Sequence, residues 1–428
     1  MPIGKTLIKS HFKLIILKKI KNLQGEKILQ KTYQTAIVGG GASGLMSAIE
    51  LLSGNGALLG EQVVVLEGTD RVGKKLVATG NGQGNLTNQN FGAQFYHGDK
   101  QFIEKFVELA QRVDLKSYLN QLGIPLCTLK DGKMYPLSKQ ASAVLDIMRA
   151  YLIHKNCTIL TNSKVEDITK TKDYFILKTS GQNILAKTVI LATGGKSAKQ
   201  FGTDGTSYNL ALKFNHKLTK LYPSLVQLKT PLDDIRGLKG IKEVAKVTAY
   251  AGEKQLAQST GDLLFTDFGV SGSSIFNLSA YLEDRQDQYI NVEFLPHLTQ
   301  SEVEDIIEQR LKLNFIDKQE VLCGIVNKKV GQAVLKSLKN HTAKEIAKAL
   351  KNFKLKITGN LGFNYSQVTK GGIDTKDVDC ATYESKLQKG LYLVGETLNV
   401  DGDCGGYNVT FAFVSAIICA RDIKSKQS

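Results

Sequence analysis

Three glycines near the start of the chain have the spacing of a phosphate-binding turn. Gly39, Gly41 and Gly44 fit the pattern G-x-G-x-x-G, between the apolar run TAIV and a stretch with helical apolar periodicity. In such a turn the first glycine permits a tight bend, the second lets a pyrophosphate approach the backbone, and the third lets helix and strand pack closely. The free N–H groups at the helix N-terminus attract the anion. The pattern therefore predicts a dinucleotide site rather than a purely structural turn.

A carboxylate follows where such sites bind a ribose. Glu67 lies at the end of the apolar run QVVVLEG, 23 residues after Gly44. A carboxylate there accepts hydrogen bonds from ribose hydroxyls and repels a 2′-phosphate. A single fingerprint provides for one dinucleotide bound in this way, and these residues leave the choice between NAD and FAD open.

The stretch GKKLVATGNGQGNLTN, residues 73–88, comes directly after this acid. Between Thr79 and Asn88 it contains three glycines and three asparagines. Glycine lets the backbone approach a ligand closely, and asparagine amides both donate and accept hydrogen bonds. We interpret the stretch as a loop along the ligand, with a solvated surface loop as the alternative.

The elements that must position these residues follow from the apolar pattern. TAIV and QVVVLEG are buried strands that flank a helix, which is a βαβ unit with parallel strands. YFILKTS, a turn at Ser180 and Gly181, a further strand and the buried run TVILA follow. Between about 215 and 365 the pattern changes to alternating strands and helices, one of which has a capping box predicted at Ser301 and Glu304. A strand, GLYLVGE, and an apolar helix, NVTFAFVSAIICA, then return to the first pattern, so we expect a discontinuous sheet domain interrupted by an insertion.

Composition limits the function classes. The 428 residues have 42% hydrophobic content and a formal net charge of +16, part of it in a leader, residues 1–31, with eight lysines and a single glutamate. The leader is interpreted as an amphipathic basic helix, a disordered tail or an over-extended translation start. Because the remaining charge is scattered and no nucleic-acid motif accompanies it, we expect no stable nucleic-acid partner. The sequence leaves the oligomeric state open.

Cysteine and apolar patterns indicate the compartment. The six cysteines form no C-x-x-C pair and the six histidines no cluster, so no metal site is expected. No run reaches the roughly 18 apolar residues of a membrane span. We therefore expect a soluble protein of the reducing cytoplasm.

Ordered blocks along the chain resemble one family. These blocks are the glycine turn, GKKLVATGNGQGNLTN, VILATGGKS, GTDGTSYNLA, PSLVQL, GDLLFTDFGVSG and GLYLVGETLNVDGDCGGYNVTFAFVSA. From about residue 33 to 421, the chain is thereby similar to the HI0933-like (BaiN-like, aminoacetone oxidase-like) FAD-dependent oxidoreductases. The resemblance implies an α/β fold with a discontinuous, glutathione reductase-type Rossmann-like FAD domain and an inserted β-barrel-like plus helical domain. The expected boundaries are 1–31 for the leader, 32–212 and 365–428 for the FAD domain, and 213–364 for the insertion.

The family pattern also assigns cofactor contacts. It implies that Gly39, Gly41, Ala42 and Gly44 bind the pyrophosphate, Glu67 the adenosine ribose, and Val165 the adenine through its backbone. Toward the ribityl chain and the isoalloxazine ring it places Lys75, Thr79, Gly80, Asn81, Asn85, Leu86, Thr87, Thr193, Gly194, Gly195, Gly395, Glu396, Gly405, Gly406, Tyr407 and Asn408. The glycines before the last helix would let its N-terminus stabilise negative charge on reduced flavin.

Three departures from the family pattern concern substrate chemistry. Gln83 and Gly84 stand where the family loop N-G-R-C-N has Arg and Cys, Asn399 stands where Asp is usual, and KSAKQFG lacks the usual proline. FAD binding does not depend on these positions. The thiol and the cation that the family has near the flavin are absent.

The resemblance implies a non-covalent FAD enzyme that moves hydride or electrons between a small organic substrate and flavin N5. Oxygen or NAD(P)H is the second substrate, the latter docking transiently. The family suggests either oxidation of small aminoketones or reduction of unsaturated carbonyl compounds. Two alternatives are a tRNA- or other nucleic-acid-associated flavoprotein and an FAD-binding protein with little turnover. No catalytic acid or base is identified, and Tyr407 is the candidate for a residue that faces substrate.

Overall fold

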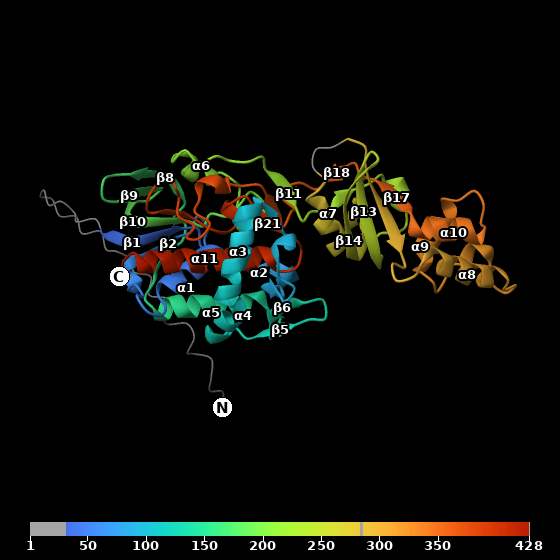
Figure 1. Ribbon diagram of the computed structural model, residues 1–428, viewed down its shortest axis with the longest axis horizontal. Coiled ribbons are helices and arrows are strands. Elements are labelled where there is room, and N and C mark those ends of the chain that lie inside the picture. Colours follow the sequence, from blue (N-terminus) through green and yellow to red (C-terminus); the bar gives the residue numbers. More distant parts are fainter. Residues whose placement is uncertain (1–30, 283–285, 428) are drawn as a thin grey trace, which may run out of the picture. The chain divides into compact units, whose positions relative to one another are not determined.

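The computed structural model describes residues 31–282 and 286–427, so the predicted leader lies outside the described residues except for Lys31. Within the described part, no helix combines the length and apolar character needed to cross a membrane. The described residues form two hydrophobic cores, each built around a seven-stranded sheet (Figure 1).

The first sheet is mainly parallel. Its strand order is β7-β2-β1-β10-β9-β8, and β20 also pairs with β10. β1 runs parallel to β2 and β10, which in turn are parallel to β7 and β20, while β8, β9 and β10 are antiparallel neighbours. The strands span Thr32–Val38 (β1), Val63–Leu66 (β2), Thr158–Leu160 (β7), Val165–Lys170 (β8), Phe175–Thr179 (β9), Asn183–Leu191 (β10) and Leu391–Leu393 (β20).

The predicted βαβ unit is confirmed. Helix α1 (Ala42–Leu51) connects β1 to β2, and the two strands are parallel, with Ile37 opposite Val65. All four residues of β2 are buried, as expected for a parallel strand covered on both faces. This doubly covered sheet is the Rossmann-like α/β fold that the sequence predicts.

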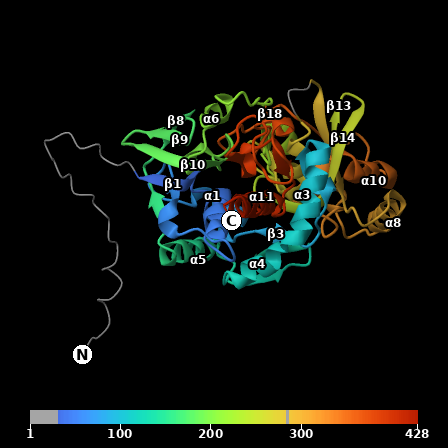
Figure 2. The same cartoon turned by 60° about the vertical axis from the view of Figure 1, so that its left-hand side comes forward.

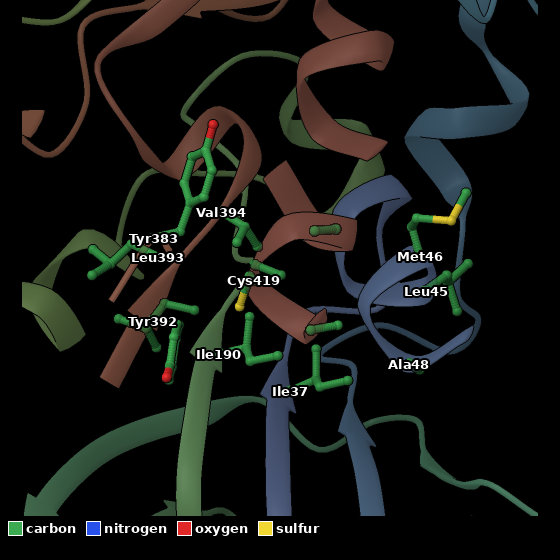
Figure 3. Close-up of a cluster of buried hydrophobic side chains, with 14 of the residues drawn as sticks. Ile37, Leu45, Met46, Ala48, Ile190, Tyr383, Tyr392, Leu393, Val394 and Cys419 are labelled. Atoms are coloured by element: carbon green, nitrogen blue, oxygen red, sulfur yellow. The ribbon is translucent and has the colours of Figure 1, made fainter. Parts of the chain in front are cut away.

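The end of the chain completes this core. Helix α11 (Tyr407–Ser425) lies against α1 and against α3 (Lys100–Val113), as the two views in Figures 1 and 2 show. Cys419 on α11 is fully buried, and Figure 3 shows it near Ile190 of β10, with Ile37 and the α1 residues in the same cluster. The late strand and helix therefore pack into the sheet that the first residues begin, which confirms that the sheet is built from both ends of the chain.

The second sheet is antiparallel throughout. Its order is β17-β16-β13-β14-β15-β12-β18, with spans Leu228–Lys229 (β12), Lys242–Ala251 (β13), Lys254–Phe265 (β14), Gly269–Ser271 (β15), Gln288–Phe294 (β16), Phe353–Lys356 (β17) and Gly359–Asn360 (β18). Its apolar face packs against the helices Ser273–Ser279 (α7), Gln300–Leu311 (α8), Lys328–Lys336 (α9) and Ala343–Lys351 (α10). The outer ends of the predicted insertion at 213–364 stay a prediction, because contacts join Thr32–Ser428 into one compact unit.

The capping box predicted for α8 was placed two residues too late. Thr299 is the N-cap, its hydroxyl accepting the N–H of Glu302 at 3.2 Å, while the Glu302 carboxylate accepts the N–H of Thr299 at 2.7 Å. Ser301 lies inside the helix instead. Two candidate Ser/Thr-x-x-Glu pairs overlap here, and the pair that follows directly on the loop caps the helix.

The remaining helices and strands are mostly short, and several of them pack in the first core. They comprise α2 (Lys74–Val77), α4 (Leu115–Gln121), α5 (Ala141–His154), α6 (Tyr208–Leu212), β3 (Thr87–Asn88), β4 (Tyr96–Gly98), β5 (Leu126–Thr128), β6 (Lys133–Pro136), β11 (Tyr222–Ser224), β19 (Val368–Lys370) and β21 (Val400–Gly402). Of these, α2, β6, β19 and β21 carry residues that line the cavity described below, and β4 carries His97, which pairs with Asp401 of β21.

Candidate functional site

A cavity of about 940 Å³ opens at the carboxyl ends of the parallel strands. Val38, Leu66 and Ala192, at or next to the ends of β1, β2 and β10, line it. Ligands of open α/β sheets bind in the crevice outside these strand ends. The cavity therefore lies where the fold predicts a dinucleotide.

The glycine turn forms one end of this cavity. A Cβ on Gly39 would lie 2.3 Å from the carbonyl oxygen of Ala192, and one on Gly44 would lie 1.9 Å from the carbonyl oxygen of Gly39. A Cβ on Gly41 would meet no atom within 4 Å. Gly39 and Gly44 are thus required by close packing, whereas Gly41 leaves open space at the N-terminus of α1, which fits the pyrophosphate of a dinucleotide.

Backbone N–H groups hold Glu67 beside this turn. Its Oε2 accepts the N–H of Gly40 at 2.9 Å and its Oε1 accepts the N–H of Thr69 at 2.7 Å. The carboxylate lines the cavity and retains lone pairs for further hydrogen bonds. The geometry fits a ribose acceptor held in place before any ligand arrives.

An ion pair crosses the middle of the cavity wall. Lys75 Nζ on α2 lies 2.6 Å from Glu396 Oε2, and Glu396 Oε1 accepts the N–H of Thr369 at 2.8 Å. Both charged side chains are about one-fifth to one-quarter exposed and line the cavity. The sequence predicts each residue as a cofactor contact but not that they pair across 321 positions.

The loop that follows α2 depends on left-handed backbone. Gly80 and Asn81 have φ of +56° and +54°, and a Cβ on Gly80 would lie 2.8 Å from the N of Asn85. The amide of Asn85 bridges two segments, its oxygen accepting the N–H of Gly406 at 3.1 Å and its nitrogen donating to the carbonyl oxygen of Thr87 at 3.2 Å. Glycine and asparagine are the residues that adopt this conformation most readily, so the composition of the loop has a structural cause.

The turn before α11 forms the opposite end. Gly405 and Gly406 have φ of +152° and +96°, and Gly406 is the N-cap of α11. Asn88 Nδ2 donates to the carbonyl oxygen of Gly405 at 3.0 Å, and Asn408 bonds both backbone groups of Gly402. The N-terminus of the long helix α11 is thus held at the cavity by two asparagines.

The structure brings most of the predicted cofactor residues together. The cavity is lined by Gly39, Gly41, Ala42, Glu67, Lys75, Thr79, Gly80, Asn81, Asn85, Val165, Thr193, Gly194, Glu396, Gly405, Gly406 and Asn408. Outside its lining lie Gly44, Leu86, Thr87, Gly195, Gly395 and Tyr407. Most of these six pack behind the wall: a Cβ on Gly195 would lie 2.4 Å from Thr369 Oγ1, and one on Gly395 2.7 Å from Ser43 Oγ.

Tyr407 packs among other side chains beside the cavity. Its ring stacks on Phe95 at 4.6 Å between centroids, its hydroxyl donates to the carbonyl oxygen of Asn90 at 2.8 Å, and the residue is 4% exposed. Tyr407 lies outside the cavity lining. That it faces substrate stays a prediction.

Side chains that the sequence analysis missed form a second wall. Lys133 and Tyr135 come from β6, Ser273 and Phe276 from α7 beside the second sheet, and Asp403 and Cys404 from the segment before Gly405. The block GDLLFTDFGVSG, which leads into α7, is part of the family resemblance, but the resemblance assigned no role to its residues. Asp403 and Cys404 could have been identified as cavity residues from their position directly before Gly405 and Gly406 in the sequence.

Lys133 contributes a cation to this wall. Its Nζ lies 2.7 Å from Asp131 Oδ2. Burial would lower the pKa of Lys133, but the hydrogen bond and charge of Asp131 raise it above its ordinary value. The side chain is therefore a cation at neutral pH, while burial raises the pKa of the neighbouring Cys404 thiol and keeps it protonated.

Comparison with known proteins agrees with this architecture. Residues 33–422 match the HI0933-like protein Rossmann domain. The 3-dehydro-bile acid delta(4,6)-reductase of Clostridium scindens is 35% identical over 402 residues, which cover 90% of this chain and 97% of the reductase. The ribosomal RNA dihydrouridine synthase of Haemophilus influenzae is 27% identical over 405 residues, covering 91% and 98% of the two chains.

One solved structure is a more distant match. The 3-ketosteroid-delta4-(5alpha)-dehydrogenase of Rhodococcus jostii RHA1 has 12% identity and a TM-score of 0.49, with 92% of this chain and 98% of that chain covered. At this level of similarity no conclusion about the reaction follows.

Proposed function

Because the chain belongs to the HI0933-like family and is an FAD-dependent oxidoreductase, we propose that it reduces a carbon–carbon double bond conjugated to a carbonyl group. The observation that carries this proposal is the 35% identity to a delta(4,6)-reductase over 97% of that enzyme's length. The name of the second relative refers to dihydrouridine, which is uridine with its ring double bond reduced. The double bonds that the two names imply, in the 3-dehydro-bile acid and in uridine, are both conjugated to a carbonyl group. This shared feature favours reduction of such a bond over aminoketone oxidation.

The proposed cofactor site runs the length of the cavity. The Gly39–Gly41 turn would hold the FAD pyrophosphate, Glu67 the adenosine ribose, and the Lys75–Glu396 pair the ribityl chain. The N-terminus of α11 would face the pyrimidine part of the flavin, where its dipole favours negative charge. Bound FAD would supply hydride for the double bond, with NAD(P)H as the proposed electron donor.

The second wall is the proposed substrate site. Phe276 offers an apolar surface, and Lys133 offers a cation that can stabilise charge developing on a carbonyl oxygen. Because Asp403 and Cys404 directly precede the Gly405–Gly406 turn, this wall lies at the proposed flavin end of the cavity. The enzyme would thus position a conjugated carbonyl compound between side chains and flavin.

The test uses the purified protein loaded with FAD under anaerobic conditions. A 3-oxo-4-ene steroid with NADH or NADPH is expected to lose its conjugated absorbance and to gain two mass units. Aminoacetone serves as the competing substrate. Bleaching of the flavin by aminoacetone, without any reduction of the steroid, would contradict the proposal.

A second candidate substrate is uridine in RNA. The relative from Haemophilus influenzae carries that name, and five lysines line the cavity, namely Lys74, Lys75, Lys133, Lys164 and Lys199. Unmodified ribosomal RNA incubated with the reduced enzyme would then contain dihydrouridine by mass spectrometry, with a strong dependence on salt. The same chemistry on a free steroid but not on RNA would decide for the small molecule.

A further inference from the structure

A cluster of titratable side chains lies behind the second wall of the cavity. His97 on β4 pairs with Asp401 on β21, and its Nδ1 lies 3.2 Å from Asp401 Oδ2. Its Nε2 lies 3.5 Å from Asp403 Oδ1 and 3.1 Å from the hydroxyl of Tyr281. The imidazole therefore connects three groups, of which Asp403 lines the cavity.

The members of the cluster differ in burial, and this difference shows which of them reach the cavity and the surface. Asp401 is 2% exposed and also accepts the hydroxyl of Ser224 at 3.3 Å, so it is fixed in the interior. The Asp403 side chain is 23% exposed, whereas Tyr281 is 36% exposed and lies outside the cavity lining. A path of polar groups thus runs from the cavity through Asp403 and His97 to Tyr281 at the surface.

The proton affinities suit transfer near neutral pH. Burial, reinforced by the charge of Asp401 and opposed by that of His97, raises the pKa of Asp403 to about 6. Burial would lower the pKa of His97, but the hydrogen bond to Asp401 and the charges of Asp401 and Asp403 raise it. Other titratable or charged groups facing the pair are Lys370, which lowers the pKa of His97, and Tyr281, Tyr407, Cys404, Lys133 and Asp131.

We propose that Asp403 is the proton donor of the reduction and that His97, oriented by Asp401, returns protons to it from the Tyr281 side. This inference rests on the proposed function. The β-carbon of the conjugated double bond receives a hydride, with its electron pair, from reduced flavin, and the substrate becomes an enolate. The carboxyl of Asp403 then gives its proton to the α-carbon. The resulting carboxylate takes a proton from the imidazolium of His97, which is reprotonated by water through Tyr281, so the substrate gains one hydride and one proton.

The coupling is testable without turnover. In protein labelled with ¹³C at histidine Cε1, the His97 signal, assigned by its loss in His97→Gln, is followed against pH by NMR. The wild type should show a raised His97 pKa and a second inflection near pH 6 from Asp403. In Asp403→Asn the inflection should vanish and the His97 pKa should fall, because a neighbouring negative charge is gone. An unchanged His97 titration in that variant would overturn the relay.

The second test separates the two half-reactions in a stopped-flow instrument. In Asp403→Asn, reduction of FAD by NAD(P)H should keep its rate, while oxidation of the reduced enzyme by the enone should slow about 10²–10³-fold and lose its pH dependence near 6. The matched control is Asp233→Asn, a carboxylate on the surface whose side chain is 88% exposed, which should leave both rates unchanged. Equal enone rates in the wild type and Asp403→Asn would overturn the assignment.

The two tests fail in different ways. If no conjugated carbonyl compound oxidises the reduced wild-type enzyme, the proposed function fails, and the NMR titration still decides whether Asp403 and His97 share a proton. If the wild type reduces the enone and only the NMR coupling is missing, the function stands and the relay is wrong.

Discussion

The cavity has a backbone wall, shaped by glycines beside the side chains of Glu67, Lys75 and Glu396, and a second wall made of side chains. Gly39, Gly41 and Gly406 shape the first wall, where the requirement is space or a particular φ angle. Phe276 and Asp403 belong to the second wall, where the requirement is the chemistry of a side chain. The difference shows why one sequence motif identifies a cofactor while no motif identifies a substrate. Substitutions should therefore affect folding or FAD at the first wall and substrate at the second.

The largest expected effect is at Gly44, a packed glycine behind the backbone wall. Gly44→Ala would place a Cβ 1.9 Å from the carbonyl oxygen of Gly39, so α1 and β1 would have to separate. We expect a loss of about 3–5 kcal/mol in the free energy of unfolding, or no soluble protein. Thermal unfolding measures this effect. Gly181→Ala is the control, since a Cβ there meets nothing within 4 Å and should change stability little. Equal stability of the two variants would show that α1 packs differently.

The open glycine of the same wall should behave differently. Gly41 has a φ of −81° that any residue adopts, and its Cβ would enter empty space. Gly41→Val is expected to fold with an unchanged melting temperature in the absence of FAD but to bind FAD about 100-fold more weakly, which corresponds to about 2.7 kcal/mol. Calorimetric titration of the apoprotein with FAD measures this. If Gly41→Val bound FAD with wild-type affinity, the proposal that the pyrophosphate binds at this turn would be wrong.

Stability against pH tests the side-chain wall. The pKa of Asp403 is raised to about 6 in the folded protein from an ordinary value near 4, so protonation favours the folded state. The contribution is fully present below about pH 4 and is lost as the pH rises through 6, an effect of about 2 kcal/mol for a side chain that is 23% exposed. Asp403→Asn should therefore gain stability relative to the wild type at pH 8 but not at pH 4. Urea unfolding at both values checks the sign, and a gain of equal size at both would contradict it.

The smallest effect is expected at the apolar side chain of the second wall. Phe276→Ala should raise KM for the enone about tenfold, because Phe276 lines the cavity at the proposed substrate site. The Kd of FAD should stay within about twofold, because Phe276 is not one of the predicted cofactor contacts. Leu278→Ala, on the same helix but 1% exposed, is the matched control and should lower stability with little change in KM. A parallel loss of FAD affinity in Phe276→Ala would mean that the two walls are not separate.

The parts predicted from sequence are those with local causes. The βαβ unit of β1, α1 and β2 follows from apolar runs and glycine spacing, and these features were correct. The run before Thr193 was predicted as two strands, but β10 is one strand from Asn183 to Leu191. Lys187 interrupts the apolar pattern there, because it lies on the exposed part of the strand, before the fully buried residues at its end.

The parts that the sequence could not predict depend on distant segments. Lys75 and Glu396 were each expected to contact the cofactor, but their pairing requires the folded sheet. His97 has no histidine cluster around it in the sequence, which therefore assigned it no role. Its partners Asp401 and Asp403 come from the opposite strand of a two-stranded sheet and the residues just after it. The orientation of Tyr407 likewise depends on the turn geometry at Gly406.

The ion pair between Lys75 and Glu396 can form only late in the synthesis of the chain. The two residues are separated by 321 positions, and β20, which pairs with β10, is also made late. At about 5–20 residues per second, a ribosome needs roughly 15–60 s to synthesise the segment between them. During that interval the glycine turn and the loop after α2 have no partner on the far side of the cavity. The nascent protein therefore cannot form this ion pair, which lines the proposed FAD site, until translation is nearly finished.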